Sequence, residues 1–209
     1  MTDLVLVRHG ETVWHAENRY AGLTDVELTR RGHDQAVLLA GWAAGAGLAA
    51  VWSSPLSRAR ITAETAAGER GAGLPVRVDE RLRELDFGQG DGLTSAEMKA
   101  RFPEARAAFE ADPAAHPLPG GEDPHLAADR FAAALRDISA AHPDGRVLVV
   151  AHTTAIRLAL CRLVGVPLGE YRRLFPRLDN CALTELRLTG PGADRVALLQ
   201  YNSPIGAVR

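Results

Sequence analysis

Two histidines, two arginines and one carboxylate in this sequence are of the types that can together transfer a phosphoryl group. Arg8 and His9 follow one short apolar run, and His152 directly follows another. A neutral imidazole can attack phosphorus, while arginines and a protonated second histidine can bind the phosphate oxygens. Arg58 would add a second guanidinium, and the carboxyl group of Glu84 could protonate a leaving alcohol. These residue types predict phosphoryl transfer without a metal.

The elements that must position these residues are visible as alternating apolar patterns. Short apolar runs predict strands at Leu4–Val7, Ala49–Trp52, Val76–Val78, Arg146–Ala151, Leu183–Leu188 and Val196–Leu199. Helices are predicted at Arg30–Ala44, at Leu56–Ala67, twice between Ser95 and Ala111, over 124–141, and after His152 through Val164. Thr29 and Asp123 are predicted caps, and Thr153 or Thr154 is predicted to cap the last helix.

This alternation predicts an α/β fold, a three-layer α/β/α sandwich with a mainly parallel central sheet. Ligands of such sheets bind beyond the carboxyl ends of the strands, where the candidate residues fall. We expect one domain over residues 1–209, in which about 93–141 form a helical and lid elaboration. Four prolines stiffen the segment Asp112–Pro124, and His116 within it is a candidate substrate contact.

Six segments, in the same order along the chain, resemble the signatures of the histidine phosphatase superfamily, in its phosphoglycerate-mutase-like branch 1. They are Arg8-His9-Gly10-Glu11-Thr12, Gly22-x-x-Asp25-x-x-Leu28-Thr29-x-x-Gly32-x-x-Gln35-Ala36, Ser54-Pro55-Leu56-Ser57-Arg58-Ala59, Leu82-Arg83-Glu84-Leu85-Asp86-Phe87-Gly88, Pro119-Gly120-Gly121-Glu122 and Val149-Val150-Ala151-His152. Any one of these would be weak evidence, whereas six at the family's spacing are highly specific.

The resemblance implies a role for each matching residue. His9 is implied as the nucleophile that becomes phosphohistidine, and Glu84 as the acid that protonates the leaving group and then activates water. Arg8, Arg58 and His152 are implied as the phosphate pocket. No metal and no organic cofactor are implied. Glu80 and Asp86 would be the fallback carboxylates.

Further pocket residues are implied by the same alignment, some of them at departures from the family pattern. Gly22 belongs to a matching motif. His15 stands where many relatives carry a phosphate-holding asparagine, and Ala21 where a polar residue is common. Thr153, with Thr154 after it, replaces the small residues that usually follow the second histidine. We therefore expect His15, Gly22 and Thr153 at the phosphate or substrate site.

Three functions compete. The leading hypothesis is a phosphatase acting on a small phosphomonoester, because Pro119-Gly120-Gly121-Glu122 resembles the phosphatase members. A phosphoglycerate-type mutase is the alternative, although Phe87 stands where mutases carry a tyrosine and residues 93–141 lack their paired basic cluster. A non-catalytic phospho-ligand binding protein is the third, and the complete set of candidate catalytic residues disfavours it.

The amino-acid composition limits the classes of partner that the protein can have. The 209 residues carry a formal net charge of −2, which disfavours nucleic acid and anionic membranes. Of 24 Lys and Arg residues a single one, Lys99, is lysine. Two cysteines make no disulfide framework, and no metal-binding motif, signal peptide or membrane-spanning run is present. We expect a cytoplasmic protein that acts on a small phosphorylated metabolite, and a homodimer is a further hypothesis from the resemblance.

Overall fold

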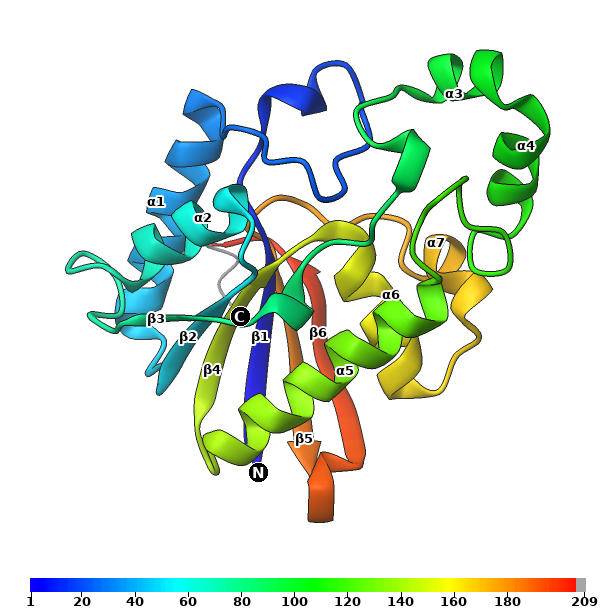
Figure 1. Ribbon diagram of the computed structural model, residues 1–209. Coiled ribbons are helices and arrows are strands. Elements are labelled where there is room, and N and C mark those ends of the chain that lie inside the picture. Colours follow the sequence, from blue (N-terminus) through cyan, green and yellow to red (C-terminus); the bar gives the residue numbers. More distant parts are fainter. Residues whose placement is uncertain (206–209) are drawn as a thin grey trace.

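A computed structural model describes residues 1–205 as helices packed against one six-stranded sheet (Figure 1). The strand order is β3-β2-β4-β1-β5-β6. β1, β2, β3 and β4 run parallel, while β5 and β6 continue the sheet antiparallel. The strands are β1 Thr2–Arg8, β2 Ala50–Ser53, β3 Val76–Val78, β4 Arg146–Ala151, β5 Leu183–Thr189 and β6 Arg195–Ser203. The predicted α/β class with a mainly parallel sheet is confirmed.

Helices cover both faces of this sheet, which makes three layers (Figure 1). The helices are α1 Arg30–Gly45, α2 Ser57–Ala67, α3 Ser95–Arg101, α4 Pro103–Ala111, α5 Pro124–Ala141, α6 Thr153–Val164 and α7 Tyr171–Leu174. Val5 and Val7 of β1 pack in the apolar cluster of α1 and α2. Leu4 and Leu6, on the opposite face, pack in the larger cluster of α5 and α6. This alternation is the two-residue period of a strand buried on both faces.

Most helix starts follow the predicted local chemistry. The Thr29 side chain accepts the Gly32 N–H at the start of α1, and the Asp123 carboxylate accepts the His125 N–H at the start of α5. The predicted threonine cap of α6 is wrong. Its N-cap is His152, which makes no side-chain cap, and the N–H groups of Thr154 and Ala155 donate instead to Glu84. A long-range contact has replaced the local cap.

The segment after β3 places α3 and α4 beyond the carboxyl ends of the parallel strands (Figure 1). Met98, Phe109 and Leu118 of this segment are buried in the cluster that α5 and α6 share. Their burial fixes the segment against the body of the fold. In the described residues, no helix is long and apolar enough to span a bilayer. Short α7, which follows α6, was not predicted.

Candidate active site

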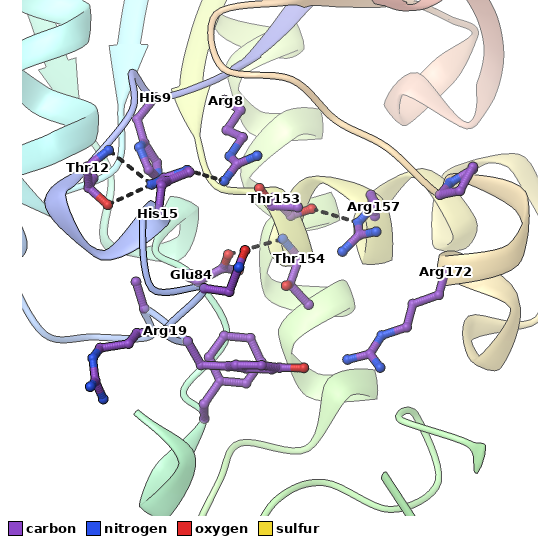
Figure 2. A pocket seen from close by; sticks show the side chains of 15 residues that line it. Arg8, His9, Thr12, His15, Arg19, Glu84, Thr153, Thr154, Arg157 and Arg172 are labelled. Carbon is purple, nitrogen blue, oxygen red and sulfur yellow. Dashed lines mark hydrogen bonds between the residues drawn. The ribbon is translucent and has the colours of Figure 1, made fainter. Parts of the chain in front are cut away.

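A pocket of about 490 Å³ lies where the chain leaves β1 and β4, and its size is that of a small-molecule site. Five of the expected residues line it, namely Arg8, His9, His15, Glu84 and Thr153 (Figure 2). The other lining residues are Thr12, Asn18, Arg19, Tyr20, Ala21, Phe87, Thr154, Arg157, Arg172 and Pro176. The fold brings the end of β1 beside the end of β4, 143 residues further along the chain (Arg8 beside Ala151), and Glu84 beside the start of α6, 70 residues away.

His9 is held in one tautomer. Its Nδ1 lies 2.7 Å from the Gly10 carbonyl oxygen, which can only accept, so Nδ1 carries the proton. Nε2 is therefore the ring nitrogen with the lone pair. Burial, together with the charges of Arg58 and Arg8, holds the pKa of His9 well below its usual value. The imidazole is neutral at neutral pH, the form that can act as a nucleophile.

The backbone of the turn after His9 packs so closely on α1 that neither Gly10 nor Gly32 has room for a side chain. A Cβ on Gly10 would lie 2.4 Å from the carbonyl oxygen of Gly32, in the first turn of α1. A Cβ on Gly32 would lie 2.1 Å from the Glu11 carbonyl oxygen. Both glycines are needed for close backbone approach, which seats the His9 turn directly on the helix.

His152 lies beside His9, with ring centroids 5.2 Å apart, and is completely buried. Its Nε2 is 2.7 Å from the Ser54 hydroxyl oxygen, while its Nδ1 is buried and has no partner. Burial, then the charges of Arg58 and His9, keeps the pKa of His152 well below its usual value. In the free protein this ring is neutral, whereas the sequence suggested a protonated one.

Arg8 is oriented by His15. The Arg8 guanidinium donates to the Leu178 carbonyl at 2.8 Å and meets His15 Nε2 at 2.6 Å. His15 Nδ1 accepts the backbone N–H of Thr12 at 3.0 Å and also lies 2.9 Å from the Thr12 hydroxyl. Burial first, and Arg8 next, lowers the pKa of His15 to about 4. The histidine in the asparagine position thus contacts Arg8 through Nε2 and the turn at Thr12 through Nδ1.

Arg58 and Gly22 are not among the residues that line the pocket, and neither is His152. The Arg58 guanidinium, 1% exposed, donates to the carbonyls of Thr24, Ala21 and Gly22. Gly22 thus contributes an acceptor for Arg58. Arg58 Nε is buried without a partner, as is Arg8 Nε. With His152 Nδ1, three buried nitrogens at this site lack a partner, and buried polar groups are rarely left so.

Glu84 reaches the pocket from the loop after β3 and is 4% exposed. Its Oε1 accepts the N–H groups of Leu85 and Ala155, each at 2.8 Å, and its Oε2 accepts that of Thr154 at 3.1 Å. Three backbone donors fix the carboxyl group at the pocket wall, and Figure 2 shows the one from Thr154. With a single donor on Oε2, that oxygen keeps capacity to exchange a proton.

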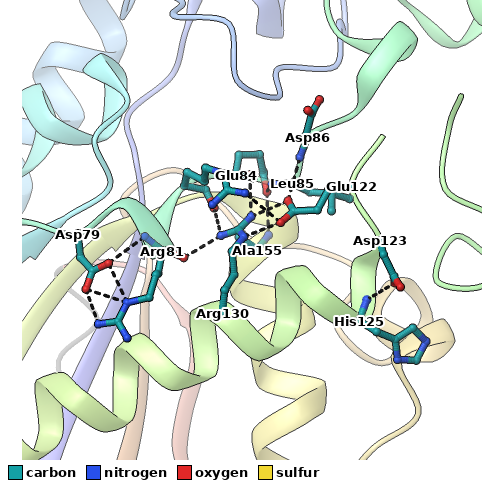
Figure 3. A network of polar contacts seen from close by, with 11 residues as sticks. Asp79, Arg81, Glu84, Leu85, Asp86, Glu122, Asp123, His125, Arg130 and Ala155 are labelled. Carbon is teal, nitrogen blue, oxygen red and sulfur yellow. Dashed lines mark hydrogen bonds and ion pairs between the residues drawn. The ribbon is translucent and has the colours of Figure 1, made fainter. Parts of the chain in front are cut away.

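An ion pair holds the loop that carries Glu84 (Figure 3). Arg130 of α5 pairs with Glu122 at 2.7 Å and donates to the backbone carbonyls of Arg81, Arg83 and Glu84. Sequence reasoning missed Arg130. The signal was its partner Glu122, the last residue of the Pro119-Gly120-Gly121-Glu122 motif.

Other sequence candidates fall outside the pocket lining. His116 and Glu80 are exposed, and the Asp86 carboxylate accepts the Gly88 N–H. Three arginines that the sequence did not single out, Arg19, Arg157 and Arg172, do line it. Within residues 1–205 no cluster of three or more His, Cys, Asp or Glu residues could hold a metal ion.

Comparisons with known proteins show which chains this one is similar to. Residues 4–202 match the sequence model of the histidine phosphatase superfamily (branch 1). The chain is 34% identical over 171 residues to phosphoserine phosphatase 1 of Hydrogenobacter thermophilus, covering 82% of this chain and 80% of the relative. It is 35% identical over 191 residues to a probable phosphoglycerate mutase, GpmB, of Salmonella paratyphi B, covering 89% of this chain and 85% of the relative.

Solved structures are similar over almost the full length. YhfR of Bacillus stearothermophilus superposes with a TM-score of 0.90 at 29% identity, covering 98% of both chains. A mycobacterial glucosyl-3-phosphoglycerate phosphatase complexed with VO3 superposes with a TM-score of 0.87 at 33% identity, covering 97% of this chain and 99% of that one.

Proposed function

The chain belongs to branch 1 of the histidine phosphatase superfamily, and from that premise we propose how its pocket hydrolyses a phosphomonoester. It is a phosphomonoester hydrolase, as are the relatives named phosphoserine phosphatase and glucosyl-3-phosphoglycerate phosphatase. Those relatives are named for small phosphorylated substrates, and we propose the same class here. The phosphoglycerate mutase alternative is not favoured.

In the first step, His9 Nε2 attacks phosphorus and the bond from phosphorus to the ester oxygen breaks. The leaving oxygen takes a proton from the Glu84 carboxyl group, and the phosphoryl group stays on His9 as phosphohistidine. In the second step, the Glu84 carboxylate takes a proton from water as the water oxygen attacks phosphorus. The P–N bond then breaks and its electron pair returns to Nε2. The products are an alcohol and inorganic phosphate.

Arg8, Arg58 and His152 are proposed to bind the phosphoryl oxygens throughout. The single observation that carries this proposal is the set of three unpartnered buried nitrogens, Arg8 Nε, Arg58 Nε and His152 Nδ1, beside the neutral His9. A phosphate dianion would supply the missing acceptors. Its charge would also offset the cost of burying two guanidinium groups.

Hydrolysis of p-nitrophenyl phosphate in the presence of EDTA tests the assignment. His9→Ala is expected to abolish turnover, and a rapid quench of the wild type in alkaline detergent with a ³²P-labelled substrate should trap protein-bound label, lost on later acid treatment, that the variant lacks. Exposed His125 provides the matched control, since His125→Ala should retain full activity. Turnover that survives His9→Ala would refute the nucleophile.

Three finer proposals accompany this function. We propose that residues 1–209 act as a single domain and work in the cytoplasm. We also propose a homodimer, for which the edge strand β6 offers half-exposed Leu198 and Leu199. Sedimentation equilibrium would reveal the mass of one chain if the dimer proposal is wrong.

A further inference from the structure

Beyond the proposed phosphate site, the pocket wall formed by α6 and α7 carries two guanidinium groups. Arg157 lies one turn along α6 from Thr153, and Arg172 lies on α7. Both side chains are half-buried and line the pocket. Figure 2 shows the two on the same wall, turned toward the space that Glu84 also faces.

Neither of these guanidinium groups has an ion-pair partner within residues 1–205. Arg157 donates to the carbonyls of Thr153 and Phe175, at 3.3 and 3.1 Å. Arg172 donates to the Tyr171 hydroxyl at 3.0 Å. All these acceptors are neutral, and the Glu84 carboxylate, which stabilises the charge of Arg157 through space, makes no ion pair with it.

Two other half-buried arginines form ion pairs with carboxylates. Arg130 pairs with Glu122 at 2.7 Å, and Arg146 pairs with Glu185 at 2.8 Å. Withdrawing a charge from water costs free energy unless an opposite charge accompanies it. Two neighbouring arginines that form no ion pair therefore indicate that the counter-ion comes with a ligand.

The guanidinium groups are also held in place before any ligand binds. The Arg172 guanidinium lies 4.6 Å from the Phe109 ring centroid, and that of Arg157 lies 5.0 Å from the Tyr171 ring centroid. Stacking on aromatic rings limits the conformations of both side chains. Little further ordering is needed when an anion arrives, which favours binding.

The pocket's own side chains form no ion pair with Arg157 or Arg172 among the described residues. Glu84, the one carboxylate among the lining residues, is already held by three backbone N–H groups. The Thr153 hydroxyl, between the proposed phosphate site and Arg157, is buried and has no partner. The wall thus offers two cations and a hydroxyl to a ligand group, in a cavity of about 490 Å³.

We propose that Arg157 and Arg172 form a subsite for a second acidic group of the substrate, a carboxylate or a second phosphate, apart from the phosphoryl group bound near His9. The inference rests on the proposed function, because it assumes that the ester phosphate binds at Arg8 and Arg58. It narrows the substrate class to phosphomonoesters that carry another negative charge a few bonds from the ester. Planar guanidinium groups suit either kind of anion.

Binding to a turnover-deficient variant tests the subsite without relying on catalysis. In the His9→Ala background, calorimetry should give a dissociation constant for 3-phosphoglycerate at least tenfold below that for glycerol 3-phosphate, which lacks the carboxylate. Adding Arg157→Gln or Arg172→Gln should bring the two constants together. Arg173→Gln, at an exposed neighbour paired with Glu170, is the matched control and should preserve the difference.

Steady-state kinetics provides the second measurement. For 3-phosphoglycerate, kcat/KM should fall at least tenfold in Arg157→Gln and Arg172→Gln, and Arg172→Lys should recover part of the loss because it retains the charge. For p-nitrophenyl phosphate, kcat/KM should change less than about threefold in all these variants, which also shows that they fold. A 1,3-propanediol bisphosphate that binds more tightly than 3-phosphoglycerate would identify the second group as a phosphate.

Each idea can fail by itself. Equal dissociation constants for 3-phosphoglycerate and glycerol 3-phosphate would overturn the subsite, as would a difference that persists in both arginine variants. Wild-type protein that binds the phosphoesters but hydrolyses none of them would refute the proposed function instead.

Discussion

Arg130 is expected to act on catalysis through the backbone of Glu84, without touching the substrate. It donates to the carbonyls of Arg81, Arg83 and Glu84 and pairs with the Glu122 carboxylate through Nε and Nη2. Arg130→Met keeps much of the aliphatic volume and removes every one of these hydrogen bonds. Both stability and the placement of Glu84 should therefore suffer.

The size of the stability loss follows from the buried Glu122 carboxylate, which loses its main partner when Arg130 is replaced. The side chains of Arg130 and Glu122 are 12% and 13% exposed, and removing one partner of a buried ion pair costs about 3–5 kcal/mol. Glu122 retains Arg83 at 3.1 Å, which argues for the lower end. We expect the free energy of unfolding to fall by about 3 kcal/mol.

The effect on catalysis should depend on the leaving group. General acid catalysis contributes roughly 10²–10⁴-fold, and its loss matters most for leaving groups of high pKa. For an alkyl phosphate we expect kcat/KM to fall about tenfold to a hundredfold. For p-nitrophenyl phosphate the loss should be much smaller, because p-nitrophenolate can leave without a proton.

Urea denaturation, together with kcat/KM for both ester types, measures these two effects. Arg60→Ala is the control, because Arg60 forms an exposed pair with Glu64 that should contribute no more than about 1 kcal/mol. Unfolding free energy within about 0.5 kcal/mol of the wild type would refute the buried-pair argument. Equal losses for alkyl and aryl esters, in a folded variant, would show that Arg130 does not act through Glu84.

Three further predictions concern the His9 side of the pocket. Gly10→Ala should lower the unfolding free energy by about 1–3 kcal/mol in urea titrations, because its Cβ meets an α1 carbonyl at 2.4 Å; wild-type stability would contradict this packing. His15→Ala should raise KM more than His15→Asn, since asparagine can still contact Arg8; equal KM values would dismiss that role. Burial lowers the pKa values of His9 and His152 in the folded protein, so below pH ~6.5 the unfolded chain binds more protons than the folded one. As the pH is lowered through this range, the free energy of unfolding should therefore fall by about 1.4 kcal/mol per pH unit for each ring. A flat pH profile of stability would contradict neutral rings.

Much of the fold could be predicted from local sequence. The bounds of β3, β4 and α5 agree with the predicted ranges, because apolar periodicity, an Asp123 cap and Pro124 are local signals. The end of α6 at Val164 was predicted correctly, but the helix begins at Thr153, which the sequence predicts as a possible cap. A threonine at position 153 fits the local pattern of a cap. The N–H groups of Thr154 and Ala155 donate instead to Glu84, 70 and 71 residues away, and no local pattern predicts that contact.

The sequence by itself determined the family and the succession of strands and helices along the chain, apart from α7. It also determined the set of candidate residues, His9, Glu84, His152 and two arginines. Those properties follow from residue types at short spacing. Tertiary structure alone decided the tautomer of His9, because a carbonyl oxygen must lie at its Nδ1. It also decided which arginines pair with a carboxylate, as Arg130 does, and which donate only to neutral groups, as Arg157 does. Charge compensation depends on distances between segments remote in the chain, and only packing sets those distances.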